Sequence, residues 1–356
     1  MTGRACQGCG APIQKDSIAG DKPLCERCFR IKHYNEALPT DLAAAEFTQM
    51  INRINFHDSV VLHIVDLFDL AGSLVTTLPR YIAGNRFVVI ANKIDLFGRD
   101  LGHDRVRNWL AEYLKKAGLK PEKIFLMSAH KGLYLDEIIK FIDEKCRNKE
   151  IYVIGATNVG KSTFINQLLK RMNIQGGEIT TSHFPGTTLD LIKLPIDNDS
   201  YIIDTPGLIL QDRYSDFLGA ESLQTITPRT AIKPAVYQLS GEQALFLGGL
   251  ARVDQLSSGR NSFVVYRANS LKIHRTKLVN ADELYQKHLG EMLSPPQTDE
   301  VERFSNIVRH CFSYNGKNKI DIVISGLGFV TISGERAEIA VHVPAGIAVE
   351  IRKSLI

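Results

Sequence analysis

The stretch that decides the fold runs from Ile151 to Leu169 and reads IYVIGATNVGKSTFINQLL. An apolar run, a turn bounded by glycines and an amphipathic segment follow one another, which predicts a strand, a loop and a helix. Gly155, Gly160, Lys161 and Ser162 give the turn the phosphate-loop pattern G-x-x-x-x-G-K-S. The loop lies in the middle of a 356-residue chain, whereas such a strand usually comes near the start of a nucleotide-binding domain.

A phosphate loop needs glycines because its backbone N–H groups must curl around phosphate oxygens. Lys161 would reach the β- and γ-phosphates, Ser162 would ligate Mg²⁺, and the N-terminus of the following helix adds a partial positive charge. The alternative is a glycine-rich turn that only leads into a helix. The nucleotide-contacting residues expected from this loop are Gly155, Asn158, Val159, Gly160, Lys161, Ser162 and Thr163.

Two stretches after the loop have the character of γ-phosphate switches. The motif DTPG, Asp204 to Gly207, ends the apolar run YIIDT. A carboxylate at Asp204 can hold the water shell of Mg²⁺, and the N–H group of Gly207 can sense the γ-phosphate. Between this motif and the phosphate loop lies FPGTTLD, where a threonine can ligate Mg²⁺ only when the γ-phosphate is present. Thr188 is the first choice for that ligand and Thr187 the second.

Two motifs earlier in the chain are suited to reading a guanine base. NKID, Asn92 to Asp95, follows the apolar run RFVVIA, and SAH begins at Ser128 after a further apolar run. The Asp95 carboxylate would accept from N1–H and the exocyclic amine of guanine, groups that adenine does not offer in that arrangement. Asn92 would brace the base and loop, the Lys93 stem would pack over the ring, and the N–H of Ala129 would point at the guanine O6. All the motifs are expected at the carboxyl ends of strands, where doubly wound sheets bind ligands.

The order of these motifs is unusual, because the base-reading motifs precede the phosphate loop. The usual GTPase order begins with the phosphate loop and ends with the base motifs. The sequence therefore predicts a complete GTPase domain that has been cut and rejoined, a circular permutation. Such a rearrangement is tolerable because the termini of compact domains often lie close together.

Strands that alternate with helices predict an α/β domain with a parallel sheet and helices on both faces. We expect three parts: a zinc-binding module at 1–42, the permuted P-loop GTPase domain at 43–213, and a β-rich domain at 214–356 that binds RNA or protein. The strands expected in the GTPase domain are 59–67, 86–95, 123–129, 151–157, 189–196 and 200–207, with helices at 42–54, 104–118 and 133–146. The C-terminal part should hold strands within 262–268, 270–275, 320–332 and 337–352, a helix at 281–293 and a loop at 294–303.

Four of the six cysteines form two pairs near the N-terminus. The spacing C-x-x-C, fifteen residues, C-x-x-C is typical of a closed tetrahedral zinc site, formed here by Cys6, Cys9, Cys25 and Cys28. Four thiolates leave no open position, so the metal would be structural and would stabilise a segment too small for its own core. A redox dithiol is the alternative.

Composition restricts the partners only weakly. The chain is 44% hydrophobic and 23% charged with a formal net charge of +4, which is compatible with nucleic acid without demanding it. No run of about 20 apolar residues predicts a membrane span, and the N-terminus lacks the apolar core of a signal peptide. We therefore expect a cytoplasmic protein without membrane partners, whose cysteines stay reduced.

The permuted motif order and the N-terminal cysteine pairs together resemble the circularly permuted GTPases, specifically the YqeH family. The resemblance covers essentially the whole chain. It implies GTP hydrolysis at a low intrinsic rate and a role in assembly of the small ribosomal subunit. It also implies GTP and GDP as ligands and a small-subunit precursor, ribosomal RNA or ribosomal protein as partner, but not DNA. A GTP-dependent scaffold or signalling protein that binds other proteins is the alternative.

Two residues suggest how hydrolysis is assisted. Leu208 follows DTPG, where Ras-like proteins carry a glutamine that orients the attacking water, and leucine cannot do so. Asn158 matches the asparagine that holds potassium in potassium-activated GTPases, so K⁺ could replace the charge of an arginine finger. The alternative is that Asn158 only caps the loop. The residues expected to be catalytic are Lys161, Thr188 and Asn158.

The C-terminal stretch SFVVYRANSLKIHRTKL interleaves aromatic and basic side chains. Such interleaving can hold single-stranded RNA by stacking and phosphate contacts. On strands, however, Phe263 and Tyr266 can equally face a core, and both interpretations stay open at this point.

Overall fold

The computed structural model describes residues 41–42, 51, 59–82, 85–98, 101–172, 180–182, 191–196, 199–208, 214 and 217–356. By its internal packing the chain divides into two compact units. We call Met1–Asp95 with Gly102–Leu210 the N-terminal unit, and Leu96–Leu101 with Gln211–Ile356 the C-terminal unit. No helix in the described part of the chain is long and apolar enough to cross a bilayer.

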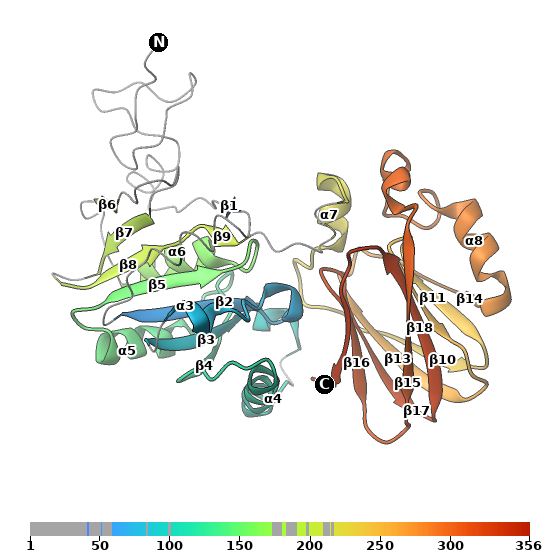
Figure 1. Cartoon of the computed structure of the whole chain (residues 1–356), viewed down its shortest axis with the longest axis horizontal. Coiled ribbons are helices and arrows are strands. Elements are labelled where there is room, and N and C mark those ends of the chain that lie inside the picture. Colours follow the sequence, from blue (N-terminus) through green and yellow to red (C-terminus); the bar gives the residue numbers. More distant parts are fainter. Residues whose placement is uncertain are drawn as a thin grey trace, which may run out of the picture. The chain divides into compact units, whose positions relative to one another are not determined.

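The N-terminal unit is built on a seven-stranded sheet in the order β4-β3-β2-β5-β8-β7-β6 (Figure 1). Its strands are β2 (Val60–Asp66), β3 (Arg86–Asn92), β4 (Ile124–Leu126), β5 (Glu150–Gly155), β6 (Thr180–Ser182), β7 (Leu191–Pro195) and β8 (Tyr201–Asp204). The five strands from β4 to β8 in this order are parallel, β7 is antiparallel to β8, and β6 is antiparallel to β7.

The expectation of a wholly parallel sheet is therefore wrong, and the sheet is mixed. A strand within 189–196 is present, but β7 pairs with β8 as a hairpin, with Pro195 opposite Tyr201. The few residues that join these two strands permit only an antiparallel return, because a parallel crossover needs a dozen or more residues.

The central strands β2 and β3 are apolar because both of their faces are covered. Every residue of β2 is buried, and in β3 only Arg86 is exposed. One face packs with helices α5 (Leu135–Lys145) and α6 (Lys161–Arg171) into a single apolar cluster. The remaining helical elements are η1 (Ala71–Ser73), α3 (Leu78–Tyr81), η2 (Ile94–Leu96) and α4 (His103–Lys116).

A small second sheet joins a segment before the GTPase strands to the DTPG motif. Strand β1 (Asp41–Leu42) pairs in parallel with β9 (Gly207–Leu208). The helix expected at 42–54 lies mostly outside the described residues, although Leu42 belongs to the strand and Ile51 is helical.

The C-terminal unit consists of two five-stranded antiparallel sheets, which confirms the expectation of a β-rich region. The first has the order β10-β13-β17-β16-β19 and the second β14-β11-β12-β18-β15. Their strands are β10 (Ala235–Ser240), β11 (Gln243–Leu247), β12 (Ala251–Gln255), β13 (Arg260–Arg267), β14 (Ile273–Lys277), β15 (Ile307–Tyr314), β16 (Ile320–Ile324), β17 (Gly328–Gly334), β18 (Ala337–Pro344) and β19 (Val349–Lys353). Side chains from both sheets form one apolar core.

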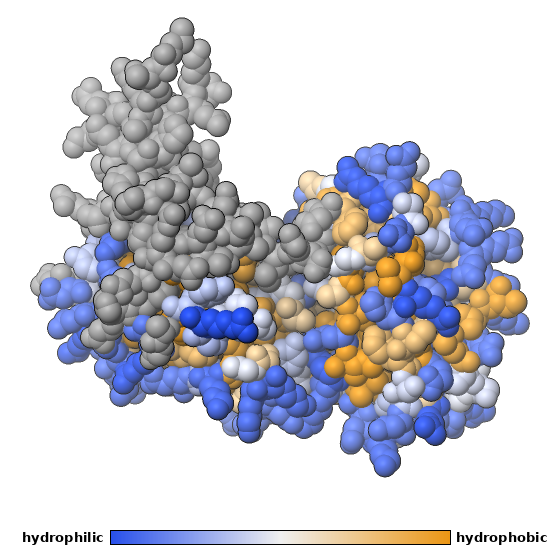
Figure 2. All heavy atoms as spheres, in the orientation of Figure 1, coloured by the Kyte–Doolittle hydropathy of each residue, from blue (hydrophilic) through white to orange (hydrophobic). Residues whose placement is uncertain are grey.

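Short helices complete this unit (Figure 1). They are α7 (Ala220–Ile226), η4 (Leu278–Asn280), α8 (Ala281–His288) and η5 (Thr298–Phe304). The expected helix at 281–293 is thus shorter than predicted, and part of the expected loop at 294–303 is helical. Apolar side chains are also exposed on this unit, as Figure 2 shows, and Val236 and Ile351 are 60% and 40% accessible.

Candidate nucleotide-binding site

The loop between β5 and α6 contains two glycines that no other residue could replace. At Gly160 the backbone has φ +91°, and a Cβ there would lie 2.3 Å from Nδ2 of Asn92. At Gly155 a Cβ would lie 2.7 Å from the carbonyl oxygen of Ile64. The close approach of β2 therefore explains Gly155, whereas the left-handed backbone and the Asn92 side chain explain Gly160.

The side chain of Asn92 joins three motifs that are far apart in the sequence. Its Nδ2 donates to the carbonyl oxygen of Val159 at 2.7 Å, and its Oδ1 accepts from the N–H of Ala129 at 2.9 Å. Asn92 is 3% exposed, so both bonds are made away from water. The phosphate loop, NKID and the SA motif therefore converge at the carboxyl ends of β3, β4 and β5.

Lys161 and Asp204 form the charged centre of the phosphate side. The Lys161 Nζ lies 3.8 Å from Oδ1 of Asp204, and the two side chains are 7% and 3% exposed. Asp204 ends β8 and lies opposite Val153 of β5, the strand that leads into the loop. Ser162 follows Lys161 in the first turn of α6 and is half-buried.

The DTPG motif is attached to the phosphate loop through its backbone. Leu208 forms a parallel bridge with Ala156, and its carbonyl oxygen accepts from the N–H of Thr157 at 2.9 Å. The Leu208 side chain is only 5% exposed. A buried aliphatic group cannot orient an attacking water, so the residue after Gly207 supplies no polar catalytic group.

The base side of the site is built around Asp95 in η2. Its side chain is 7% exposed, and Oδ2 lies 3.7 Å from Nζ of Lys131. The turn that follows β4 is closed by Ser128, whose hydroxyl accepts from the N–H of Lys131 at 3.1 Å. The carboxylate of Asp95 has two oxygens, and these can accept hydrogen bonds from N1–H and the exocyclic amine of guanine.

The sequence analysis missed Asp66 and Ser73, which lie beside NKID. Oδ2 of Asp66 lies 2.5 Å from Nζ of Lys93, and Oδ1 accepts from the N–H of Phe68 at 3.0 Å. The buried Ser73 hydroxyl accepts from the N–H of Asp66 at 2.9 Å. A signal for Asp66 existed, because it ends the apolar run next to the one that carries NKID.

Asn158 lies in the phosphate loop, between β5 and α6. Its backbone is left-handed with φ +62°, a conformation that asparagine tolerates better than most residues, and its side chain is exposed. Thr187, Thr188, Cys6, Cys9, Cys25 and Cys28 lie outside the described residues. Among those that are described, no group of three or more His, Cys, Asp and Glu side chains is arranged to hold a metal.

The two aromatic residues considered for RNA stacking are buried. Phe263 is 0% and Tyr266 8% exposed, and the Tyr266 ring stacks on Phe329 with centroids 4.6 Å apart. The interpretation that RNA bases stack on these two rings is therefore wrong. Both side chains belong to the packing of the C-terminal unit: Phe263 lies in its apolar core, and Tyr266 packs on Phe329.

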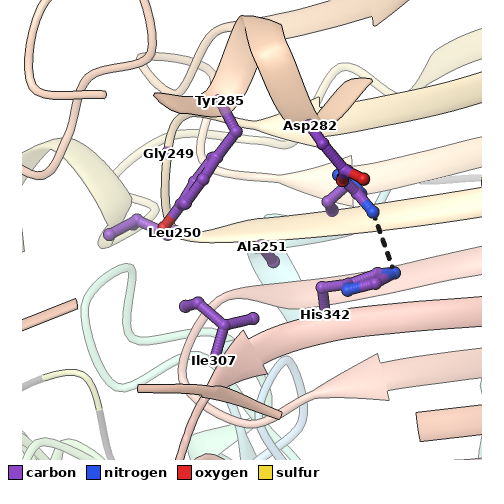
Figure 3. A pocket seen from close by; sticks show the side chains of 8 residues that line it. Gly249, Leu250, Ala251, Asp282, Tyr285, Ile307 and His342 are labelled. Carbon is purple, nitrogen blue, oxygen red and sulfur yellow. Dashed lines mark hydrogen bonds and ion pairs between the residues drawn. The ribbon is translucent and has the colours of Figure 1, made fainter. Parts of the chain in front are cut away.

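A separate pocket of about 250 Å³ lies on the C-terminal unit, between α8 and the ends of β15 and β18 (Figure 3). Arg252 contacts Asp254 at 3.1 Å and Asp282 at 2.6 Å, and its Nη2 lies 3.1 Å from the ring of His342. Tyr285 forms the opposite wall. The charges of the pocket are thus already paired with one another, which gives it no evident preference for a ligand charge.

Comparisons with known proteins agree with this geometry. Residues 150–235 match the family described as 50S ribosome-binding GTPase, and residues 260–355 match the one described as YqeH-like, C-terminal. The chain is 26% identical to a putative nitric oxide synthase of Oryza sativa subsp. japonica, over 92% of this chain and 69% of the relative. The solved YjeQ of Thermotoga maritima is 22% identical over 42% of this chain and 48% of that one. Its TM-score of 0.28 is too low to support a conclusion about this chain.

A much stronger similarity covers the entire chain. It is 41% identical over 362 residues to YqeH of Bacillus subtilis (strain 168), and the match spans 99% of both chains. The base motifs precede the phosphate loop in the sequence and still meet it through Asn92. The chain therefore belongs to the YqeH family of circularly permuted GTPases, and it is a GTP hydrolase.

Proposed function

We propose that this GTPase is an assembly factor for the small ribosomal subunit, and that GTP sets its affinity for a precursor particle or its ribosomal RNA. The observation that carries the nucleotide part is the placement of Asn92, which holds the phosphate loop and the base motifs in one site. The ribosomal part rests on the family resemblance.

In the proposed site, Asp95 selects guanine. Its buried carboxylate accepts from N1–H and the exocyclic amine of the base, and the Lys131 ammonium lies 3.7 Å from it. The N–H of Ala129, which was expected to point at O6 of guanine, donates to Oδ1 of Asn92 in this structure. It therefore fixes the loop from which O6 would be approached. The Lys93 stem lies along the base and Ser128 closes the turn beneath it.

On the phosphate side, backbone N–H groups of the loop and the Lys161 ammonium bind the phosphate oxygens. The donor set fits Mg²⁺, because a hydroxyl at Ser162 and a nearly buried carboxylate at Asp204 are the oxygen ligands that this ion prefers. Bound Mg²⁺ would neutralise developing phosphate charge. Thr188, or else Thr187, would complete its shell, and Gly207 would sense the γ-phosphate.

Hydrolysis needs a positive charge or a water-orienting group that Leu208 does not provide. We assign this role to K⁺ held by Asn158, or to a partner that stimulates the enzyme. The exposed side chain of Asn158 supports the assignment, because a cation there could reach the phosphates from solvent.

We also retain a structural zinc site formed by Cys6, Cys9, Cys25 and Cys28, on the evidence of their spacing alone. The metal would be bound by four thiolates and would take no part in hydrolysis. Zinc content of the purified protein tests this assignment. About one zinc per chain is expected, and none after the Cys6 and Cys9 thiols are both replaced by serine.

The ribosomal proposal is tested by sedimentation with purified particles. The family described for residues 150–235 is named for binding to 50S subunits, so small and large subunits are both offered. We expect the protein with a non-hydrolysable GTP analogue to sediment with small-subunit particles and not with large ones. A preference for large subunits would contradict the proposal without affecting the GTPase assignment.

A GTP-dependent scaffold that binds protein partners is the competing function. Salt dependence separates the two, because docking on RNA releases counterions and weakens steeply as salt rises. We expect a steep decrease in particle binding between low and moderate potassium chloride concentrations. Binding that scarcely changes with salt would favour the protein-binding alternative.

A further inference from the structure

Asp66 and Lys93 face each other across two neighbouring parallel strands. Asp66 ends β2 opposite Asn92, the last residue of β3, and the next residue after Asn92 is Lys93. The carboxylate Oδ2 and the ammonium Nζ are 2.5 Å apart, and their side chains are only 11% and 25% exposed. The pair is therefore better shielded from solvent than an ordinary surface ion pair.

The Asp66 side of this pair is fixed at several points. Its N–H donates to the hydroxyl of Ser73, and its Oδ1 accepts from the N–H of Phe68. The following N–H, that of Leu67, donates to the carbonyl oxygen of Asn92 at 3.1 Å. The carboxylate thus has a defined position, with one oxygen used by its own turn and the other aimed at Lys93.

Lys93 needs such support. Its backbone has φ +68°, in the left-handed region that a long L side chain seldom adopts. A lysine stem also has many rotamers, and ordering it on a ligand costs conformational entropy unless the side chain is already held. Contact with Asp66 holds the far end of the stem in the protein without nucleotide.

We propose that Asp66 is a positioning residue for guanine recognition: it holds the Lys93 ammonium so that the lysine stem forms a preformed wall for the base. The inference rests on the proposed base-binding role of Lys93. Because GDP and GTP share the base, Asp66 contributes equally to the affinity for both and leaves the γ-phosphate switch untouched.

The test is a double-mutant cycle in the full chain, read as dissociation of a fluorescent GDP analogue. Asp66→Asn keeps an oxygen for the N–H of Phe68 but removes the charge, and Lys93→Met keeps most of the stem but removes the ammonium. We expect each single variant to release GDP about tenfold faster. The double variant should be no worse than either single one, because the two residues act through one contact.

A matched control comes from another ion pair of the same unit. Asp136 contacts Arg171 at 2.9 Å, but both side chains are largely exposed and neither lies in a nucleotide motif. Asp136→Asn should release GDP at the unmodified rate. Thermal unfolding without nucleotide is measured for all variants, so that a general loss of folding is separated from a loss of affinity.

Three results would overturn the inference: an unchanged rate for Asp66→Asn, multiplying effects in the double variant, or a defect for GTP alone. The proposed base site is tested separately by Asp95→Asn. Normal GDP affinity in Asp95→Asn would show that the proposed base site is wrong. Normal GDP affinity in Asp66→Asn, together with weakened GDP affinity in Asp95→Asn, would refute only the role of Asp66.

Discussion

Gly160 of the phosphate loop lies directly against Asn92 of the NKID motif, so that a Cβ on the glycine would come within 2.3 Å of the asparagine Nδ2. The same Nδ2 donates to the carbonyl oxygen of Val159. Two motifs in permuted order therefore share one tightly packed contact, and the space for a side chain at Gly160 is taken by the residue that joins them.

Gly160→Ala is expected to damage the nucleotide site. The methyl group would displace Asn92, and the left-handed backbone costs roughly 1–2 kcal/mol for a residue with a Cβ. We expect affinity for GDP to fall at least about tenfold, measured by calorimetric titration. Gly98→Ala is the control, because a Cβ there meets nothing within 4 Å and no change in affinity should result. Equal affinities of the two variants would contradict the packing argument.

Asp95→Asn should change the base that the enzyme prefers. An amide can donate to the oxygen that xanthine carries where guanine has its amine, so affinity for GTP should fall and that for xanthosine triphosphate should rise. Competition against a fluorescent GDP analogue measures both. The unmodified protein should reject ATP, and comparable binding of ATP and GTP by that protein would remove Asp95 from its proposed role.

The cation dependence of hydrolysis follows from Leu208 and Asn158. Because Leu208 is buried and apolar, we expect phosphate release to be faster in KCl than in NaCl at equal ionic strength. Asn158→Ala should erase the difference while GDP affinity stays within a few-fold of normal. If the rates in the two salts do not differ, the missing charge comes from a partner instead.

The burial of His63 predicts that the stability of the fold decreases in acid. It lies on β2 fully buried, its Nε2 accepts from the N–H of Val75, and burial lowers its pKa from 6.5 to about 4. Between those two values the unfolded chain binds a proton that the folded chain does not, so stability falls as the pH decreases from about 6.5 to 4. The loss by pH 4 should be about 3 kcal/mol from this group.

His63→Gln keeps an acceptor for Val75 but cannot titrate. Urea unfolding of both proteins at several pH values measures the effect, and the difference between their stabilities should shrink or reverse as the pH falls. Parallel stability curves for the two proteins across this range would show that His63 is not the group responsible.

The motifs were the most predictable part of the protein. Gly155, Gly160 and Asn92 make the close contacts that join the motifs in this chain, and each of them stands in a short letter pattern that the sequence shows directly. The pairing of Asp66 with Lys93 was not predictable in this way. It depends on which strands are neighbours in the sheet, and the local sequence does not state this.

The strands and their burial were also only partly predictable from the local sequence. The apolar runs of β2, β3 and β5 are visible because they are buried on both faces, whereas β10 and β12 were missed because they mix polar with apolar residues. The burial of Tyr266 depends on Phe329, which in turn stacks near Phe97 from a distant part of the chain. Periodicity within a short window cannot reveal such coverage.

The last prediction concerns the switch. Gly207 and Leu208 pair with Asp41 and Leu42 on one side, while Leu208 also bonds to Thr157 of the phosphate loop. A change at the γ-phosphate can therefore alter β1, the strand at the end of the proposed zinc-binding module. We expect small-subunit particles to bind the GTP-analogue form about tenfold more tightly than the GDP form, which needs about 1.4 kcal/mol of differential contact.

Lys161→Ala should abolish the difference by emptying the site. Removal of residues 1–40 keeps β1 and should weaken binding in both states without changing basal hydrolysis. Equal particle affinity with GDP, the GTP analogue and no nucleotide would refute the switch, although the protein would remain a GTPase.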